Sequence, residues 1–250
     1  MIEKDIGIKR DGLNLAAKVA IPSSNNYDVA VLAYGFVGMM DPKVNDLLPT
    51  LAKKLQDEGM ATIRFDFNGH GLSDGKLANM SIFNELEDYH AILQYAIDHL
   101  SGLNHLYLIG HSQGGVLSSM IAGYYPDKID KLIIMSPAAT LVDDARIGTC
   151  MGINYNPNNI PKEIDFKNFR LNDWYFRTAK FINIYDTAKA FRGPVLAIHG
   201  EQDQVVNSYA SRHYQAIYNN CKLYIIPESD HGLHINRNLV YKYILDFLKN

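Results

Sequence analysis

The 250-residue sequence has few cysteines, little excess charge of either sign and no long apolar run. Its only two cysteines, Cys150 and Cys221, belong to no CxxC or histidine-rich cluster, which argues against both a metal site and a disulfide framework. The formal net charge is −3, and no run of basic residues offers a surface to a phosphate backbone or an anionic membrane. We therefore expect no bound metal and no nucleic-acid partner.

The longest nearly apolar stretch, residues 29–40, is much shorter than the roughly 18 residues that a membrane-spanning helix needs. The N-terminal segment MIEKDIGIKRDGLNL is charged from its third residue and lacks the apolar core of a signal peptide. These two absences predict a soluble, cytoplasmic protein with no membrane partner.

What the sequence does contain is a change of hydrophobic period. Apolar residues recur at every second position from Leu13 to Ile21, just after the turn-forming pair Asp11-Gly12, which predicts an antiparallel strand pair. Further on, continuous apolar runs (29–34, 61–66, 106–110, 131–135, 194–200 and 222–227) alternate with helical stretches (47–59, 81–100 and 114–126). This alternation is typical of a parallel sheet that helices cover on both faces. We expect one α/β domain over residues 1–250.

One segment interrupts the alternation. Almost 60 residues separate the apolar runs 131–135 and 194–200, about twice what a crossover helix with its loops requires. We interpret residues 138–192 as an insertion, partly loop and partly helix, containing NYNPNNIP and NDWYFRTAKF. Insertions at the carboxyl ends of parallel strands often shape a ligand site.

The segment LYLIGHSQGG places Ser112 in a G-x-S-x-G motif between a strand and a helix. In that context the motif is typical of a nucleophile elbow, where a strained turn exposes the serine and crowding requires small flanking residues. The alternative is a tight turn whose serine only caps the following helix. A serine nucleophile needs a base, a group that orients the base, and donors for an oxyanion.

Nine histidines are candidates for the base, and the chain order Ser, Asp or Glu, His favours those after Ser112. His231 lies on the loop directly after the last strand and is preferred, with His234 as the weaker rival. His199 ends an apolar strand, where a buried, hydrogen-bonded role is expected.

The orienting carboxylate is expected after the preceding strand, where Glu201 and Asp203 are available. Asp203 is preferred because the turn needs several residues before a side chain can point back across the sheet. Asp230 is adjacent to His231, and neighbouring side chains on an extended loop usually diverge. Asp203 would hold the neutral tautomer of the base and stabilise the imidazolium.

The expected oxyanion donors are the backbone N–H groups of Gln113, after the nucleophile, and Phe36, in the glycine-containing loop after the first parallel strand. A plain glycine turn is the alternative for that loop. The polar loop RFDFNGHGLSDG also follows a strand. We assign it a structural role, with Asp66 and the glycines fixing loops below the site.

Taken together, Gly35-Phe36, DFNGHGLSDG, GHSQGG, HGEQD and SDH resemble the α/β-hydrolase superfamily across essentially the whole chain. More narrowly, DFNGHGLSDGK, IGHSQGGV, SPAATL and the long insertion with YNPNNIP are similar to bacterial cinnamoyl (feruloyl) esterases. The resemblance implies cofactor-free hydrolysis of small esters with an aromatic acyl group, such as ferulate, caffeate, p-coumarate or chlorogenate. It also implies that the insertion is a lid over that group.

The resemblance also implies a set of substrate-binding positions. Asp144 and Tyr175 match insert positions whose polar groups hold the phenolic ring hydroxyls. Two positions depart from the family pattern: Tyr34 replaces the histidine usual before the oxyanion glycine, and Met151 replaces a polar glutamine. The oxyanion donors are backbone groups and should survive, while preference among ring substituents is open.

Two rival functions stay open from the sequence. A short-chain carboxylesterase or monoacylglycerol lipase, or an aminopeptidase, would use the same nucleophile, base and carboxylate on another acyl group. A binding protein of this fold without turnover is the rival from a different class, although an intact Ser, His and Asp argue against it. Ser112 excludes a haloalkane dehalogenase, which needs aspartate at the elbow. The oligomeric state is also open, a homodimer included.

Overall fold

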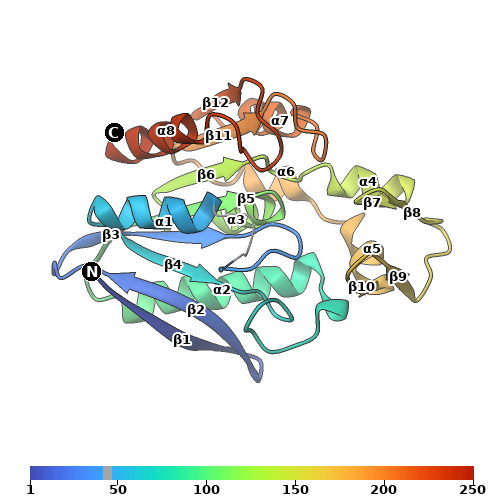
Figure 1. Ribbon diagram of the computed structural model, residues 1–250, viewed down its shortest axis with the longest axis horizontal. Coiled ribbons are helices and arrows are strands. Elements are labelled where there is room, and N and C mark those ends of the chain that lie inside the picture. Colours follow the sequence, from blue (N-terminus) through green and yellow to red (C-terminus); the bar gives the residue numbers. More distant parts are fainter. Residues whose placement is uncertain (42–46) are drawn as a thin grey trace.

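The computed structural model describes residues 1–41 and 47–250. Its central feature is an eight-stranded sheet with strand order β1-β2-β4-β3-β5-β6-β11-β12 (Figure 1). These strands are β1 (Ile2–Arg10), β2 (Leu13–Ile21), β3 (Tyr27–Ala33), β4 (Ala61–Phe65), β5 (Leu103–His111), β6 (Lys131–Met135), β11 (Val195–Gly200) and β12 (Cys221–Ile226). β2 is antiparallel to both β1 and β4, and the other neighbours are parallel. The predicted N-terminal strand pair and mostly parallel sheet are confirmed.

Helices cover both faces of this sheet, as the sequence predicted. They are α1 (Leu47–Asp57), α2 (Ile82–His99), α3 (Gln113–Tyr124), α4 (Leu141–Ile147), α5 (Asp173–Ala179), α6 (Ile184–Ala188), α7 (Tyr209–Ile217) and α8 (Arg237–Lys249), with a 3₁₀ turn η1 (Leu77–Asn79). Helices α1 and α8 pack on one face, and α2, α3, α6 and α7 contribute to the core on the other. No helix among the described residues is both long and apolar enough to cross a membrane.

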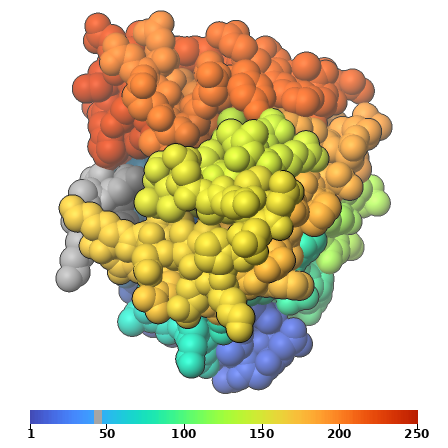
Figure 2. Space-filling view, turned by 90° about the vertical axis from the view of Figure 1, so that its right-hand side faces the viewer, coloured from blue at the N-terminus to red at the C-terminus, as the bar shows by residue number. Residues whose placement is uncertain are grey.

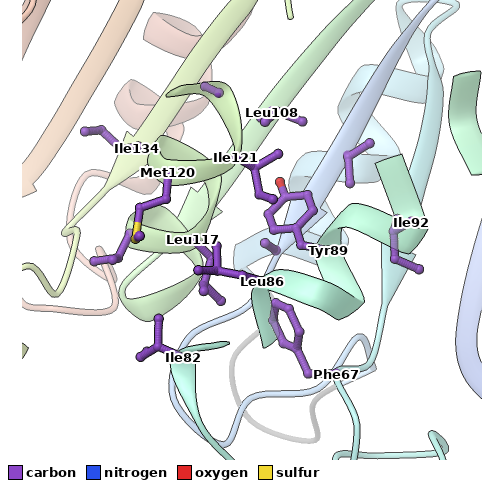
Figure 3. Packing of buried hydrophobic residues seen from close by; sticks show 14 of the residues in the cluster. Phe67, Ile82, Leu86, Tyr89, Ile92, Leu108, Leu117, Met120, Ile121 and Ile134 are labelled. Atoms are coloured by element: carbon purple, nitrogen blue, oxygen red, sulfur yellow. The ribbon is translucent and has the colours of Figure 1, made fainter. Parts of the chain in front are cut away.

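The sheet interior explains why the predicted strands were continuously apolar. In β3, Val29 and Val31 point into the core beneath α2 and α3, whereas Ala30 and Leu32 point into the core beneath α1 and α8. A strand that is buried on both faces has no polar side to show in its sequence. Figure 3 shows part of the core beneath α2 and α3. There Leu86 and Tyr89 of α2 lie close to Leu117 and Ile121 of α3, the helix that follows Ser112.

Most of the inserted segment, residues 138–192, lies beside the carboxyl ends of the parallel strands (Figure 1). Its yellow part covers much of the face turned to the viewer in Figure 2. It holds α4, α5 and α6, as the partly helical interpretation expected, and also two small two-stranded sheets. Their strands are β7 (Thr149–Cys150), β8 (Ile153–Asn154), β9 (Glu163–Asp165) and β10 (Arg170–Asn172). The sequence did not predict these strands, because two or three residues are too few to display a period of two.

Candidate active site

Ser112 occupies a strained turn between β5 and α3. Its backbone has φ 56° and ψ −124°, in a region that non-glycine residues rarely adopt. A Cβ at Gly110 would collide with the carbonyl of Gly114, and a Cβ at Gly114 would collide with the carbonyl of Ala33. The two glycines of the motif are therefore required by close backbone packing, which is the geometry of a nucleophile elbow.

Three predicted side chains meet at this turn. Ser112 Oγ lies 2.9 Å from His231 Nε2, and His231 Nδ1 lies 2.7 Å from Asp203 Oδ2. The Asp203 carboxylate accepts the Nδ1–H bond, so Nε2 presents a lone pair to the serine hydroxyl. This arrangement can remove the proton of Ser112 as the oxygen attacks an electrophilic carbon.

Asp203 is held by more donors than His231 alone. Its Oδ1 accepts from the backbone N–H groups of Val205 and Val206, both at 2.8 Å, and His199 Nε2 lies 3.2 Å from Oδ2. Burial raises the pKa of Asp203, but hydrogen bonds from His199, His231 and the Val206 amide outweigh it and hold this pKa well below its ordinary value. Asp203 is therefore an anion that stabilises a positive charge on His231.

His199 plays the buried, hydrogen-bonded role that the sequence indicated. Its ring is fully buried, and Nδ1 lies 2.8 Å from the hydroxyl of Ser211. Its Nε2 is also within 3.0 Å of the Val206 carbonyl. The ring thus donates from Nε2 toward the Asp203 loop and accepts from Ser211, which fixes both the loop and the tautomer.

The less favoured candidates lie apart from this arrangement. His234 Nδ1 pairs with Asp230 Oδ2 at 2.8 Å, and both side chains are half exposed. Glu201 accepts a hydrogen bond from the backbone N–H of Glu228. The structure therefore brings together Ser112, His231 and Asp203 and leaves these alternatives outside.

His111 was not singled out from the sequence, yet it supports the loop that carries His231. Its Nε2–H donates to the His231 carbonyl at 2.8 Å. Burial, followed by the nearby His231, lowers the pKa of His111 from 6.5 to about 4. His111 is accordingly a neutral donor at neutral pH.

This lowered pKa predicts acid-sensitive folding. Between pH 6.5 and pH 4 the unfolded chain binds a proton at His111 that the folded chain does not, so the free energy of unfolding falls as pH falls. The His111→Gln variant keeps an N–H donor but does not titrate. We expect its stability deficit relative to the wild-type protein, measured by urea unfolding, to shrink by about 3 kcal/mol between pH 7 and pH 4. A deficit that is the same at both pH values would contradict this assignment.

The two expected oxyanion donors lie beside Ser112. A Cβ on Gly35 would lie 2.8 Å from Ser112 Cβ and 3.2 Å from Ser112 Oγ, so the loop bearing Phe36 runs against the serine. Gln113 is the first residue of α3, and the first N–H groups of a helix have no partner within it. Neither amide donates to another group within residues 1–41 and 47–250. Both are free to donate to a developing negative charge.

The Gln113 side chain is the centre of a buried polar chain that the sequence did not reveal. Its Nε2 donates to Glu85 Oε2 at 2.6 Å, and its Oε1 accepts from the Tyr175 hydroxyl at 2.8 Å. Burial, together with the charge of Asp88, raises the pKa of Glu85 well above its ordinary value, which favours the neutral acid. These hydrogen bonds connect the elbow to α2 on one side and to α5 of the inserted segment on the other.

Removing the Tyr175 hydroxyl should therefore destabilise the protein. Tyr175→Phe leaves Gln113 Oε1 buried without its donor, which costs about 1–3 kcal/mol in the free energy of unfolding. The matched control is Tyr155→Phe, because Tyr155 lines the same cavity but its hydroxyl makes only a long contact, of 3.5 Å, with the Ala145 carbonyl. Chemical denaturation of both variants measures the difference. Equal losses would show that the Tyr175 hydroxyl bond carries no particular stability.

A cavity of about 380 Å³ opens between Ser112 and the inserted segment. Asp144, Met151 and Tyr175, three of the four expected substrate-binding residues, line it together with Ser112. Thr140 Oγ1 donates to Asp144 Oδ2 at 3.1 Å, and burial raises the pKa of the Asp144 carboxyl. The cavity thus combines mostly apolar walls with the partly buried carboxyl of Asp144.

Tyr34, the fourth expected substrate-binding residue, lies elsewhere. It lines a second cavity of about 200 Å³ that also reaches Ser112. Its hydroxyl donates to the Met40 carbonyl at 2.7 Å, and the side chain is buried. Tyr34 therefore fixes the loop after β3 through its hydroxyl while its body forms part of the wall.

The polar loop after β4 has the structural contacts expected of it. Asp66 accepts from the backbone N–H of Met40 through one carboxylate oxygen and from that of Leu72 through the other, at 2.6 and 2.9 Å. Ser73 donates to the Asp66 carbonyl. This loop thus holds Met40, in the segment that follows the loop bearing Phe36. Within the described ranges, no cluster of three or more His, Cys, Asp or Glu residues is placed to hold a metal ion.

This fold with a Ser–His–Asp arrangement at an elbow defines a serine hydrolase of the α/β-hydrolase class. The model of the Hydrolase_4 family, described as serine aminopeptidase, S33, matches residues 45–185, and the chain belongs to that family.

Two solved structures of one bacterial protein are similar over nearly the whole chain. Est1E from Butyrivibrio proteoclasticus with ferulic acid bound is 33% identical, with a TM-score of 0.92 and coverage of 97% of both chains. A second Est1E structure is 30% identical, with a TM-score of 0.88 and coverage of 98% of this chain and 97% of the other. The expected resemblance to cinnamoyl esterases is confirmed.

More distant matches add less. GrgF from Penicillium sp. sh18 is an α/β hydrolase with 18% identity, a TM-score of 0.81 and coverage of 100% of this chain and 98% of the other, and it shows the fold alone. A curated Escherichia coli relative, an uncharacterized 31.7 kDa protein in the traX-finO intergenic region, is 31% identical over 83 residues. That match spans 33% of this chain and 28% of the relative's length.

Proposed function

We propose that the protein hydrolyses carboxylic esters of hydroxycinnamic acids, such as ferulate, caffeate, p-coumarate and chlorogenate, through an acyl-enzyme on Ser112. The observation that carries the proposal is the cavity of about 380 Å³ beside Ser112, which has mostly apolar and aromatic walls and the carboxyl of Asp144. The Est1E structure with ferulic acid bound, at 33% identity over nearly the full chain, supports the same substrate class.

In the proposed mechanism Ser112 Oγ attacks the ester carbonyl while His231 Nε2 takes its proton. The N–H groups of Phe36 and Gln113 donate to the oxyanion, and Asp203 stabilises the imidazolium. His231 then protonates the leaving alcohol, and the acyl group stays on Ser112. Water attacks this acyl-enzyme with His231 again as the base, which releases the acid and restores Ser112.

The inserted segment, residues 138–192, acts in this proposal as a lid over the acyl group. Asp144 accepts a hydrogen bond from a phenolic ring hydroxyl. The Tyr175 hydroxyl donates to Gln113, but its oxygen keeps lone pairs that can accept from the ring. Met151 offers the ring an apolar contact where a glutamine would offer a polar one.

The second candidate is a general carboxylesterase or monoacylglycerol lipase that uses the same three residues. The apolar part of the cavity wall, including Leu141, Phe176 and Val206, supports it because such a wall would accept an alkyl chain. The family description also raises an aminopeptidase, whose substrate would be an amide.

Comparing kcat/KM for methyl ferulate and ethyl butyrate under identical conditions tests the proposal, with Ser112→Ala as the blank. We expect a ferulate preference of about tenfold or more, which corresponds to about 1.4 kcal/mol of differential transition-state binding. Serine-dependent hydrolysis of butyrate with little hydrolysis of ferulate would contradict the hydroxycinnamate assignment and favour the general esterase.

An Asp144→Asn variant separates recognition of the ring hydroxyl from general binding of an aromatic group. Loss of a charged acceptor should lower kcat/KM for methyl ferulate by about tenfold. Methyl cinnamate, which has no ring hydroxyl, is the matched substrate and should change by less than about twofold. Equal losses on both substrates would assign Asp144 to the structure of the lid.

A further inference from the structure

Two cavities meet at Ser112, and different residues line them on the two sides of the nucleophile. Both the larger cavity, of about 380 Å³, and the smaller cavity, of about 200 Å³, include Phe36 and Ser112. Among the described lining residues, Gln113 borders only the larger cavity and His231 borders only the smaller one. The base therefore faces one side of the nucleophile.

This asymmetry assigns the two halves of an ester. When the tetrahedral intermediate collapses, the carbon–oxygen bond to the alcohol breaks and the leaving oxygen takes the proton held on His231 Nε2. That oxygen must lie near Nε2, which is 2.9 Å from Ser112 Oγ. The alcohol thus extends into the smaller cavity, and the acyl group remains on Ser112 in the larger one.

The described wall of the smaller cavity is mostly apolar. It includes Met39, Leu47 and Leu48, and no Lys, Arg, Asp or Glu occurs among its described lining residues. The two other polar side chains among the described lining residues, Tyr34 and His111, have already committed their donor protons. The Tyr34 hydroxyl donates to the Met40 carbonyl, and His111 donates to the His231 carbonyl.

A polyhydroxylated or anionic alcohol would therefore lose water without gaining a further side-chain N–H or O–H donor from the described part of this wall, which is unfavourable. The volume of about 200 Å³ is also below the roughly 300 Å³ at which pockets for drug-sized ligands begin. We propose that this cavity is the leaving-group subsite, and that it selects esters of short, uncharged, apolar alcohols over esters of polyhydroxylated or anionic alcohols, so that chlorogenate is hydrolysed more slowly than caffeate esters of simple alcohols. The inference rests on the proposed ester hydrolysis by Ser112 and adds the class of alcohol.

A series with one acyl group and different alcohols tests the subsite. The substrates are methyl caffeate, n-butyl caffeate and chlorogenate, in which caffeate is esterified to the polyhydroxylated, anionic quinate. We expect kcat/KM for n-butyl caffeate to exceed that for methyl caffeate by about threefold or more, and that for chlorogenate by about tenfold or more. A chlorogenate value equal to or above the n-butyl value would overturn the proposal.

Met39 offers a variant confined to this subsite. It lines the smaller cavity only, and its side chain is 39% exposed, so Met39→Gln should fold normally. We expect kcat/KM for n-butyl caffeate to fall by about three- to tenfold while methyl caffeate changes by less than about twofold. The matched control is Leu72→Gln, at a side chain that is 78% exposed and lines neither cavity. Equal losses on both esters in Met39→Gln would count against the subsite.

Parallel measurements on methyl and n-butyl butyrate separate this proposal from the hydroxycinnamate assignment. If butyrates are hydrolysed and caffeates are not, the proposed acyl specificity fails, while the methyl to n-butyl ratio in the butyrates still tests the alcohol subsite. A preference for n-butyl in that series would support the subsite. A ratio near one in every series that is hydrolysed would overturn it.

Discussion

Ser112→Ala is expected to lower kcat for ester hydrolysis by about 10⁶-fold, as loss of the nucleophile does in comparable sites. The reason is that Ser112 Oγ is the hydroxyl in contact with His231 Nε2, and alanine has no oxygen to attack the ester. Alanine keeps the Cβ that the elbow already accommodates at φ 56°, so the melting temperature should stay within a few degrees. Steady-state kinetics and thermal unfolding measure the two effects.

The matched control for this variant is Ser101→Ala, in an exposed turn. It should keep wild-type kinetics, and a fluorophosphonate should label both it and the wild-type protein but not Ser112→Ala. Wild-type activity in Ser112→Ala would refute the assignment of the nucleophile. Absence of labelling in the wild-type protein would instead favour a binding protein that does not turn over.

Asp203→Asn is expected to lower kcat by about 10⁴-fold with little change in the fold. An amide keeps the shape of the carboxyl but can donate toward His231 Nδ1, so the imidazole adopts the tautomer with a proton on Nε2. That nitrogen then has no lone pair for the Ser112 hydroxyl. The loss of the anion also removes the partner of the imidazolium.

Asp230→Asn provides the comparison, since Asp230 is a half-exposed carboxylate that pairs with His234 in the same way that Asp203 pairs with His231. We expect its kcat to remain within about twofold of the wild-type value. If the two variants lost activity equally, Asp203 would have no special role in orienting the base.

The sequence was most informative where local geometry alone constrains the residue. Ser112 could be predicted because the elbow requires a strand, a helix and glycines at 110 and 114. Each of these features can be recognised in a short stretch of sequence. His231 and Asp203 could be predicted because loops after neighbouring parallel strands meet at one edge of the sheet. At that edge His231 Nδ1 lies 2.7 Å from Asp203 Oδ2, and His231 Nε2 lies 2.9 Å from Ser112 Oγ.

The sequence was least informative about contacts that depend on packing between distant segments. His111 donates to the carbonyl of a residue 120 positions away, and Gln113 bonds Glu85 and Tyr175, which lie on different helices. No spacing rule connects such residues, because the layers that bring them together form only in the folded chain. The positions of His231 in the wall of the smaller cavity and of Gln113 in the wall of the larger one are of the same kind.

The most direct test of the acyl-enzyme is to partition it between two nucleophiles. Methyl, n-butyl and p-nitrophenyl ferulate are hydrolysed in the presence of one fixed concentration of ethanol, and the ratio of ethyl ferulate to ferulic acid is measured for each. If all three esters acylate Ser112, they pass through one feruloyl-enzyme, and the ratio is the same for every leaving group. A ratio that changes with the leaving group, or hydrolysis without any ethyl ferulate, would contradict the account.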